Sequence, residues 1–152
     1  MEHLSSQRIR PESLREISVR AGLDYFDLYL IHFPIALQYV DINDRYPPEW
    51  IFNPQNENPT MELDSVPLSE TWAAMESLVE NQLARQIGVC NYSAVLLHDL
   101  MSYARIKPAM LQIESHPYLT QDALIRTARS YNIAVTAFSP LGALSYLSLI
   151  HI

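Results

Sequence analysis

Four short apolar runs recur along the chain, separated by segments in which apolar residues repeat at helical spacing. The runs cover residues 27–32, 87–91, 109–114 and 133–139. Near-continuous apolar runs of this length are typical of β-strands buried on both faces. Pro34 and Pro140 follow the first and last runs, and proline cannot donate to a strand ladder. The pattern therefore predicts four buried strands that end near these positions.

The segments between the runs predict helices. We expect them over residues 11–22 and 70–84, and after Ser93 and Thr120, with Ser69, Ser93 and Thr120 as N-caps. Strict alternation of helices and strands favours parallel strands with helical crossovers, an α/β fold. Crossovers this short favour a barrel over an open sheet. A complete (β/α)8 TIM barrel needs eight units and about 250 residues, so four strands predict a partial barrel over residues 1–152.

Residues 35–67 break the alternation. This stretch is rich in proline and asparagine and also carries several aromatic residues, Trp50 among them. A structureless connection of this length is unusual in a compact domain and is often a binding loop. The alternative is a disordered linker between two domains, although such linkers are usually poor in aromatic residues. We therefore expect a binding loop here.

Composition excludes several classes of function. The chain has 152 residues, of which 49% are apolar and 18% charged, and its net charge of −7 does not suit a nucleic-acid binder. The single cysteine excludes an intrachain disulfide and a cysteine-rich zinc site. The sequence contains no apolar run of membrane-span length, no signal-peptide core and no Gly-rich phosphate loop. We expect a cytoplasmic protein that does not act at a membrane, and nothing in the sequence indicates an oligomeric state.

Polar residues gather where the predicted strands end. They are His32, Cys90 with Asn91, Gln112 with Glu114 and His116, and Ser139. In a parallel barrel all carboxyl ends of the strands face the same side, which is where such barrels place their chemistry. The alternative is that strand ends are polar simply because loops begin there.

Four segments at these strand ends resemble the aldo-keto reductase family. They are DLYLIHFP (27–34), RQIGVCNY (85–92), LQIESHPY (111–118) and AFSPLG (137–142), and they occur in the family's order and spacing. The loop segment YPPEW (46–50) is most similar to the xylose reductase branch. The resemblance covers about residues 14 to 142. Beyond Gly142 it weakens, so we expect residues 143–152 to be a non-native or truncated tail.

The resemblance implies a (β/α)8 barrel that binds NADPH, or alternatively NADH, without a Rossmann domain. It also implies that the protein reduces an aldehyde or ketone, for example a sugar aldehyde such as xylose. It implies that His32 orients the substrate carbonyl, while Cys90, Asn91 and Gln112 bind the nicotinamide carboxamide. It further implies that Phe138 stacks on the nicotinamide and that Ser139, Leu141 and Gly142 lie along the pyrophosphate. Phe33 and Trp50 would line the substrate pocket. The family usually has serine where this chain has Cys90, and a thiol is the weaker hydrogen-bonding group.

The family's general acid, a tyrosine paired with lysine and aspartate, lies on strands before the one that ends at His32, so we expect this chain to be inactive alone. Lys107, the only lysine, precedes a strand and so belongs to the opposite face of the barrel. Tyr92 and Tyr118 follow strands but lack a cationic partner that would lower their pKa. Two alternatives stay open. One is a non-catalytic cofactor-binding or interaction module, and the other a metal-dependent hydrolase using His32, Glu114 and His116, whose spacing matches no metal motif.

Overall fold

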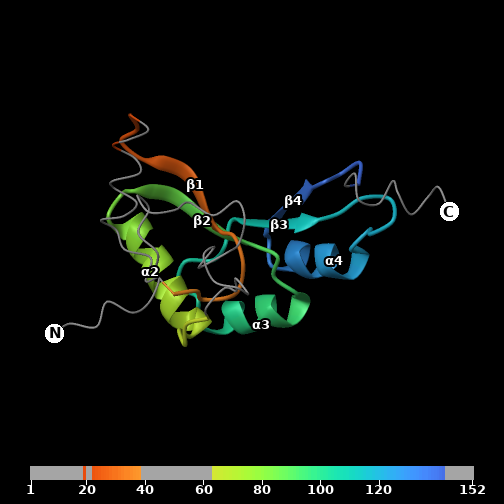
Figure 1. Cartoon of the computed structure of the whole chain (residues 1–152), viewed down its shortest axis with the longest axis horizontal. Helices are drawn as coiled ribbons and strands as arrows, with labels where there is room; N and C mark the ends of the chain where they lie inside the picture. The colour runs from red at the N-terminus through yellow and green to blue at the C-terminus, as the bar shows by residue number, and fades with distance from the viewer. Residues whose placement is uncertain (1–18, 20–21, 39–62, 143–152) are drawn as a thin grey trace, which may run out of the picture.

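The structure is a computed structural model that describes residues 19, 22–38 and 63–142. Within these residues it contains the strands β1 (Phe26–Ile31), β2 (Ala84–Cys90), β3 (Met110–Glu114) and β4 (Ala134–Phe138) and the helices α2 (Leu68–Glu80), α3 (Ala94–Tyr103) and α4 (Asp122–Ser130). The strands form one parallel sheet in the order β1-β2-β3-β4, and the helices lie on one side of it (Figure 1). The predicted α/β fold with four parallel strands is confirmed.

The register aligns one residue from every strand in a single row. Ile31 pairs with Val89, Val89 with Leu111, and Leu111 with Val135. Val89 and Leu111 are fully buried in the apolar core formed with the helices. Because successive side chains of a strand point to opposite faces, the next row, which pairs Cys90 with Gln112, faces away from the helices. The sheet therefore has one core face and one face that carries polar side chains.

Helix α2 begins and ends earlier than the sequence predicts. Ser69 is not its N-cap, because the cap is Pro67, whose carbonyl accepts the first hydrogen bonds of the helix without any side-chain cap. The predicted end at Ala84 is also wrong. The helix ends at Glu80, Gln82 adopts a left-handed φ of 60°, and Ala84 already belongs to β2.

The predicted cap of α3 is confirmed and that of α4 is wrong. The Ser93 side chain accepts a hydrogen bond from the backbone N–H of Leu96, as an N-cap does. Thr120 instead donates its hydroxyl hydrogen to the Asp122 carboxylate at 3.3 Å. The N-cap of α4 is Gln121, which has a left-handed φ of 56°. A backbone conformation, rather than a capping side chain, therefore starts this helix.

Several predicted segments fall outside the described residues. They are most of the helix over 11–22, the middle of the loop that contains Trp50, and the tail 143–152. Gly22, at the expected end of the first helix, has a φ of 66° and donates to the Val19 carbonyl at 3.1 Å. An antiparallel bridge between Leu37 and Leu63 joins the two described ends of the loop. None of the helices in the described segments is long and apolar enough to cross a bilayer.

A buried carboxylate on α2 holds the connection between α3 and β3. Glu76 is 3% exposed, and its Oε1 accepts hydrogen bonds from the backbone N–H groups of Arg105 at 2.7 Å and Ile106 at 2.9 Å. Its Oε2 lies 2.8 Å from the Arg105 guanidinium. Burial of a carboxylate is tolerated when it is paired and hydrogen-bonded in this way.

We expect Glu76→Ala to lower the free energy of unfolding by about 1.5–3 kcal/mol, the range for a hydrogen bond to a charged group. Glu76→Gln keeps an acceptor oxygen and should cost less. The control is Glu80→Ala, which removes a half-exposed ion pair with Arg105 and should cost at most about 1 kcal/mol. Urea unfolding of the three variants measures this order, and equal losses for Glu76→Ala and Glu80→Ala would contradict it.

Gly88 allows β2 to approach both neighbouring strands. A Cβ at this position would lie 2.5 Å from the Met110 carbonyl oxygen and 2.7 Å from Cδ2 of Leu30. Both distances are shorter than real Cβ contacts, and the Met110 oxygen belongs to the backbone and cannot rotate away. The pairing of β2 with β3 therefore requires glycine at residue 88.

Gly88→Ala should destabilise the chain by about 1–3 kcal/mol, the usual cost of overpacking a core. Gln86→Ala, at an exposed position of the same strand, is the control and should change stability by no more than about 0.5 kcal/mol. Thermal and denaturant unfolding monitored by circular dichroism compares the two. A Gly88→Ala chain as stable as Gln86→Ala would mean that the strands separate without cost.

Candidate functional site

Four of the predicted site residues come together at the carboxyl ends of β1, β2 and β3. Cys90 and Gln112 are register partners, and the Cys90 Sγ donates to the Gln112 Oε1 at 3.5 Å. Asn91 donates its backbone N–H to the Gln112 carbonyl at 2.9 Å and its side-chain Nδ2 to the His32 carbonyl at 2.8 Å. The structure thus links His32, Cys90, Asn91 and Gln112 into one polar edge.

The Cys90 thiol is buried and acts as a hydrogen-bond donor. The residue is 5% exposed, and burial raises the pKa of its thiol above the usual value of 9.0. The thiol therefore keeps its proton at neutral pH and can donate it to the Gln112 side-chain oxygen. A thiol is a weak donor, so this bond to the Gln112 carboxamide is a weak one.

His32 is the first residue after β1, so the strand ends where Pro34 predicts, and the His32 side chain is exposed. Its ring lies close to that of Phe33, with the ring centroids 4.5 Å apart and the planes inclined by 33°. Phe33 is half-buried. The imidazole and an apolar ring therefore stand side by side at the rim of the sheet, while Trp50 lies outside the described residues.

The residues predicted to contact the rest of the cofactor follow β4. Phe138 is half-buried and lies beside Glu114 in the register of β3 and β4. Ser139 and Gly142 both have left-handed φ values, 48° and 82°, and the Gly142 N–H donates to the Ser139 carbonyl at 2.8 Å. Leu141 is 95% exposed at the tip of this turn. Phe138 thus reaches the polar edge, while the other three residues form a tight turn beyond it.

Glu114 and His116 organise the loop between β3 and α4. The His116 Nε2 lies 3.4 Å from the Glu114 carboxylate, and its Nδ1 accepts the backbone N–H of Tyr118 at 3.2 Å. His116 also forms an antiparallel bridge with Leu119. Within residues 22–38 and 63–142, no three His, Cys, Asp or Glu side chains are grouped as metal ligands would be. These contacts give the pair a structural part in the loop.

Tyr92 and Lys107 lie where they cannot act together as an acid. Tyr92 is 2% exposed, and burial, with smaller contributions from Tyr103 and Asp99, raises the pKa of its phenol well above 10. Lys107 precedes β3 and donates its Nζ to the Met101 carbonyl at 3.0 Å. The lysine thus lies at the amino end of its strand, as expected from the sequence.

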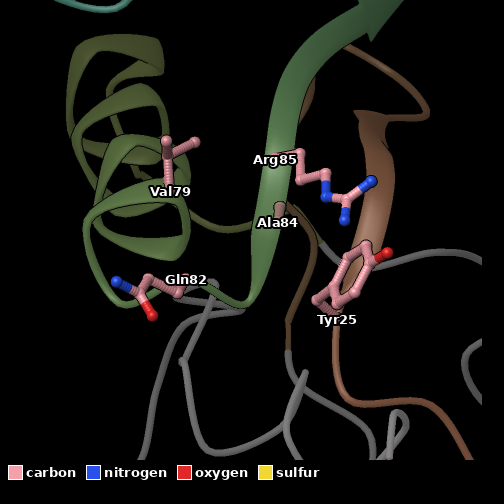
Figure 2. Close-up of a pocket in the computed structure, with 5 residues that line it drawn as sticks. All are labelled: Tyr25, Val79, Gln82, Ala84 and Arg85. Carbon is pink, nitrogen blue, oxygen red and sulfur yellow. The ribbon is translucent and has the colours of Figure 1, made fainter.

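A hollow lies at the opposite, amino end of β2. It has a volume of about 380 Å³ and is lined by Tyr25, Val79, Gln82, Ala84 and Arg85 (Figure 2). The Arg85 guanidinium lies 3.9 Å from the centroid of the Tyr25 ring and forms an ion pair with Asp27 at 2.8 Å. This cluster was not predicted from the sequence, although Asp27 and Arg85 stand near the start of two paired parallel strands. It contains none of the predicted site residues, and amino-end clusters in barrels usually serve stability.

Comparison with known proteins assigns the chain to a family. The sequence profile of the Aldo/keto reductase family matches residues 1–148, and the chain belongs to this family. A protein of Aspergillus clavatus, described as a probable NAD(P)H-dependent D-xylose reductase, is 53% identical over 144 residues, 95% of this chain and 42% of that protein. Its Aspergillus fumigatus counterpart is 58% identical over 128 residues, 84% of this chain and 39% of that protein.

Solved structures of the family have the same arrangement of elements. Aldose reductase from Giardia lamblia superposes with a TM-score of 0.73 at 39% identity, covering 90% of this chain and 43% of that one. A Bombyx mori aldo-keto reductase in complex with NADP superposes with a TM-score of 0.67 at 37% identity, covering 84% of this chain and 35% of that one. The four strands are thus part of a barrel fold, and the chain spans about two fifths of its curated relatives.

The buried phenols make the chain sensitive to alkali. The pKa of Tyr92 is raised above 10, and burial together with the charge of Asp99 raises that of Tyr103 to about 12. Above about pH 10 the unfolded chain releases protons that the folded chain still holds, so the free energy of unfolding falls as the pH rises. Tyr92→Phe should flatten this fall, as measured by urea unfolding between about pH 8 and 11. An equally steep fall in the variant would contradict the assignment.

Proposed function

We propose that this chain carries the carbonyl-binding and nicotinamide-binding edge of an NADPH-dependent reductase that converts aldehydes or ketones to alcohols. The observation that carries the proposal is the convergence of His32, Cys90, Asn91 and Gln112 at one edge of a parallel sheet. Family membership and the D-xylose reductases among the relatives support sugar aldehydes such as xylose as substrates. NADPH is proposed over NADH, and a cytoplasmic location stays a prediction.

The donor set of the edge suits the neutral end of a nicotinamide cofactor. A carboxamide needs both hydrogen-bond donors and acceptors, and the side chains of Asn91 and Gln112 are themselves carboxamides that offer both. The Asn91 Nδ2 carries two hydrogens, of which one goes to the His32 carbonyl and the other remains for a ligand oxygen. Phe138, half-buried at the end of β4, offers a ring face for stacking.

The bound cofactor would supply a hydride to the carbonyl carbon of the substrate. His32 would donate a hydrogen bond to the carbonyl oxygen, which orients the carbonyl and stabilises the charge that develops on its oxygen. Phe33 provides an apolar wall next to the imidazole. The alcohol also needs a proton, and Tyr92 cannot supply it readily because its side chain is buried and the pKa of its phenol is raised.

The burial of Tyr92 at the end of β2, where it cannot readily act as an acid, favours a second candidate function. A chain that orients a cofactor and a carbonyl without donating a proton would be a non-catalytic cofactor-binding module. The two functions differ in turnover and agree in cofactor binding. A combined binding and reduction experiment therefore separates them.

We expect the purified chain to bind NADPH and to reduce D-xylose or a simple aldehyde only at a trace rate, because positioned acid–base catalysis contributes about 10²–10⁴-fold. Binding is followed by the fluorescence of the reduced nicotinamide and turnover by its loss of absorbance. Gln112→Ala should weaken NADPH binding about 2–10-fold, the loss of one hydrogen bond. His32→Ala should leave NADPH affinity unchanged, since its partner is the carbonyl oxygen.

The control for this experiment is Gln86→Ala, an exposed residue of β2 four positions before Cys90. Robust turnover by the unmodified chain would overturn the account of the missing acid. If neither the parent chain nor Gln86→Ala bound NADPH, the cofactor proposal itself would fail. An equal loss of affinity in His32→Ala and Gln112→Ala would move His32 to a structural role.

A further inference from the structure

Asn91 links three neighbouring strands at the polar edge. It is the first residue after β2, its backbone N–H donates to the Gln112 carbonyl on β3, and its side-chain Nδ2 donates to the His32 carbonyl after β1. The last register pair of β1 with β2 is Ile31 with Val89. The side-chain bond therefore extends the tie between these strands one residue beyond the ladder, to His32 itself.

The residue type matters for two independent reasons. Asn91 has a left-handed φ of 59°, which most side chains avoid and asparagine tolerates unusually well. In this conformation the chain turns at the strand end, so that the backbone faces β3 while the side chain faces β1. A serine or a thiol at this position could not supply the carboxamide N–H that reaches the His32 carbonyl at 2.8 Å.

We propose that Asn91 is a positioning residue that fixes the backbone of His32 relative to Gln112. The inference rests on the proposed function for its catalytic meaning, and the contacts stand without any cofactor. The hydrogen bond from Asn91 fixes the main chain from which the imidazole of His32 extends, and the ring itself lies beside that of Phe33. Reacting groups must be held to within fractions of an ångström for efficient hydride transfer, and misplacement by about 1 Å can cost 10²-fold in rate. Asn91 thus connects His32, which would orient the substrate carbonyl, with Gln112, which would bind the nicotinamide carboxamide.

The test compares two changes at residue 91 with the same change elsewhere. Asn91→Asp keeps the shape and the tolerance of a left-handed φ but removes the N–H donor, and Asn91→Gly removes the side chain. Asn132→Asp is the matched control, since Asn132 also has a left-handed φ, 60°, but lies before β4 at the other end of the sheet. Nuclear magnetic resonance of the isotope-labelled chain, without cofactor, follows the carbonyl-carbon and imidazole signals of His32. The indole N–H of Trp72, bonded to the Ile106 carbonyl, reports on the fold.

Both changes at residue 91 should shift the His32 carbonyl and imidazole signals while the Trp72 signal stays in place, and Asn132→Asp should shift none of them. In the unchanged chain, one of the two Asn91 side-chain protons should exchange with solvent more slowly than those of Asn132. That second measurement needs no variant, so it decides the matter if both changes unfold the chain. Unshifted His32 signals with an intact Trp72 signal, or equally fast exchange at Asn91 and Asn132, would overturn the proposal.

Adding NADPH to the same samples separates the two hypotheses. If Asn91 controls the His32 signals but NADPH shifts no resonance at the polar edge, the positioning role of Asn91 stands and the proposed function fails. If the chain binds NADPH but the His32 signals do not change in the Asn91 variants, the proposed function stands and the positioning role of Asn91 fails.

Discussion

The close approach of β2 to β3 is the constraint on which the rest of the structure depends. It needs a residue without a side chain at Gly88, where a Cβ would collide with the Met110 backbone. With the strands at this distance, Val89 pairs with Leu111 in the core and Cys90 pairs with Gln112 on the opposite face. The same pairing brings the Asn91 N–H to the Gln112 carbonyl. The core and the polar edge are therefore two consequences of one register.

The sequence predicts the strands better than the ends of the helices, for a physical reason. Near-continuous apolar runs mark strands, and all four strands lie within a few residues of the predicted runs, but the prediction that all four are buried is wrong, since only β2 and β3 contain buried residues. The starts of α2 and α4 depend on backbone conformation at Pro67 and Gln121, which residue preferences for capping do not reveal. Glu76 is missed as well, because a buried acid depends on a partner loop thirty residues away.

In the candidate site, too, the residue types could be predicted from the sequence but the contacts between strands could not. Its residue types were predicted from position at strand ends and from family resemblance, and the structure brings four of them together. The tie from Asn91 to the His32 carbonyl was not predicted, since it needs both a left-handed φ and the register of three strands. The one signal in the sequence was the residue type itself, because asparagine is a residue that tolerates this conformation directly after a strand. Contacts that depend on several strands at once cannot be inferred from one segment.

The two ends of the described sheet differ in the polar side chains that they carry. Arg85, Asp27 and Lys107 lie toward the amino ends of their strands, where the first two neutralise each other. The carboxyl edge instead offers the carboxamides of Asn91 and Gln112, and burial raises the pKa of the Cys90 thiol and of the neighbouring Tyr92 phenol. Burial around Cys90 and Tyr92 disfavours charged forms, so this part of the edge suits a neutral carboxamide better than an ionised acid. The roles proposed for this edge, orienting a carbonyl and a carboxamide, fit that preference for neutral groups.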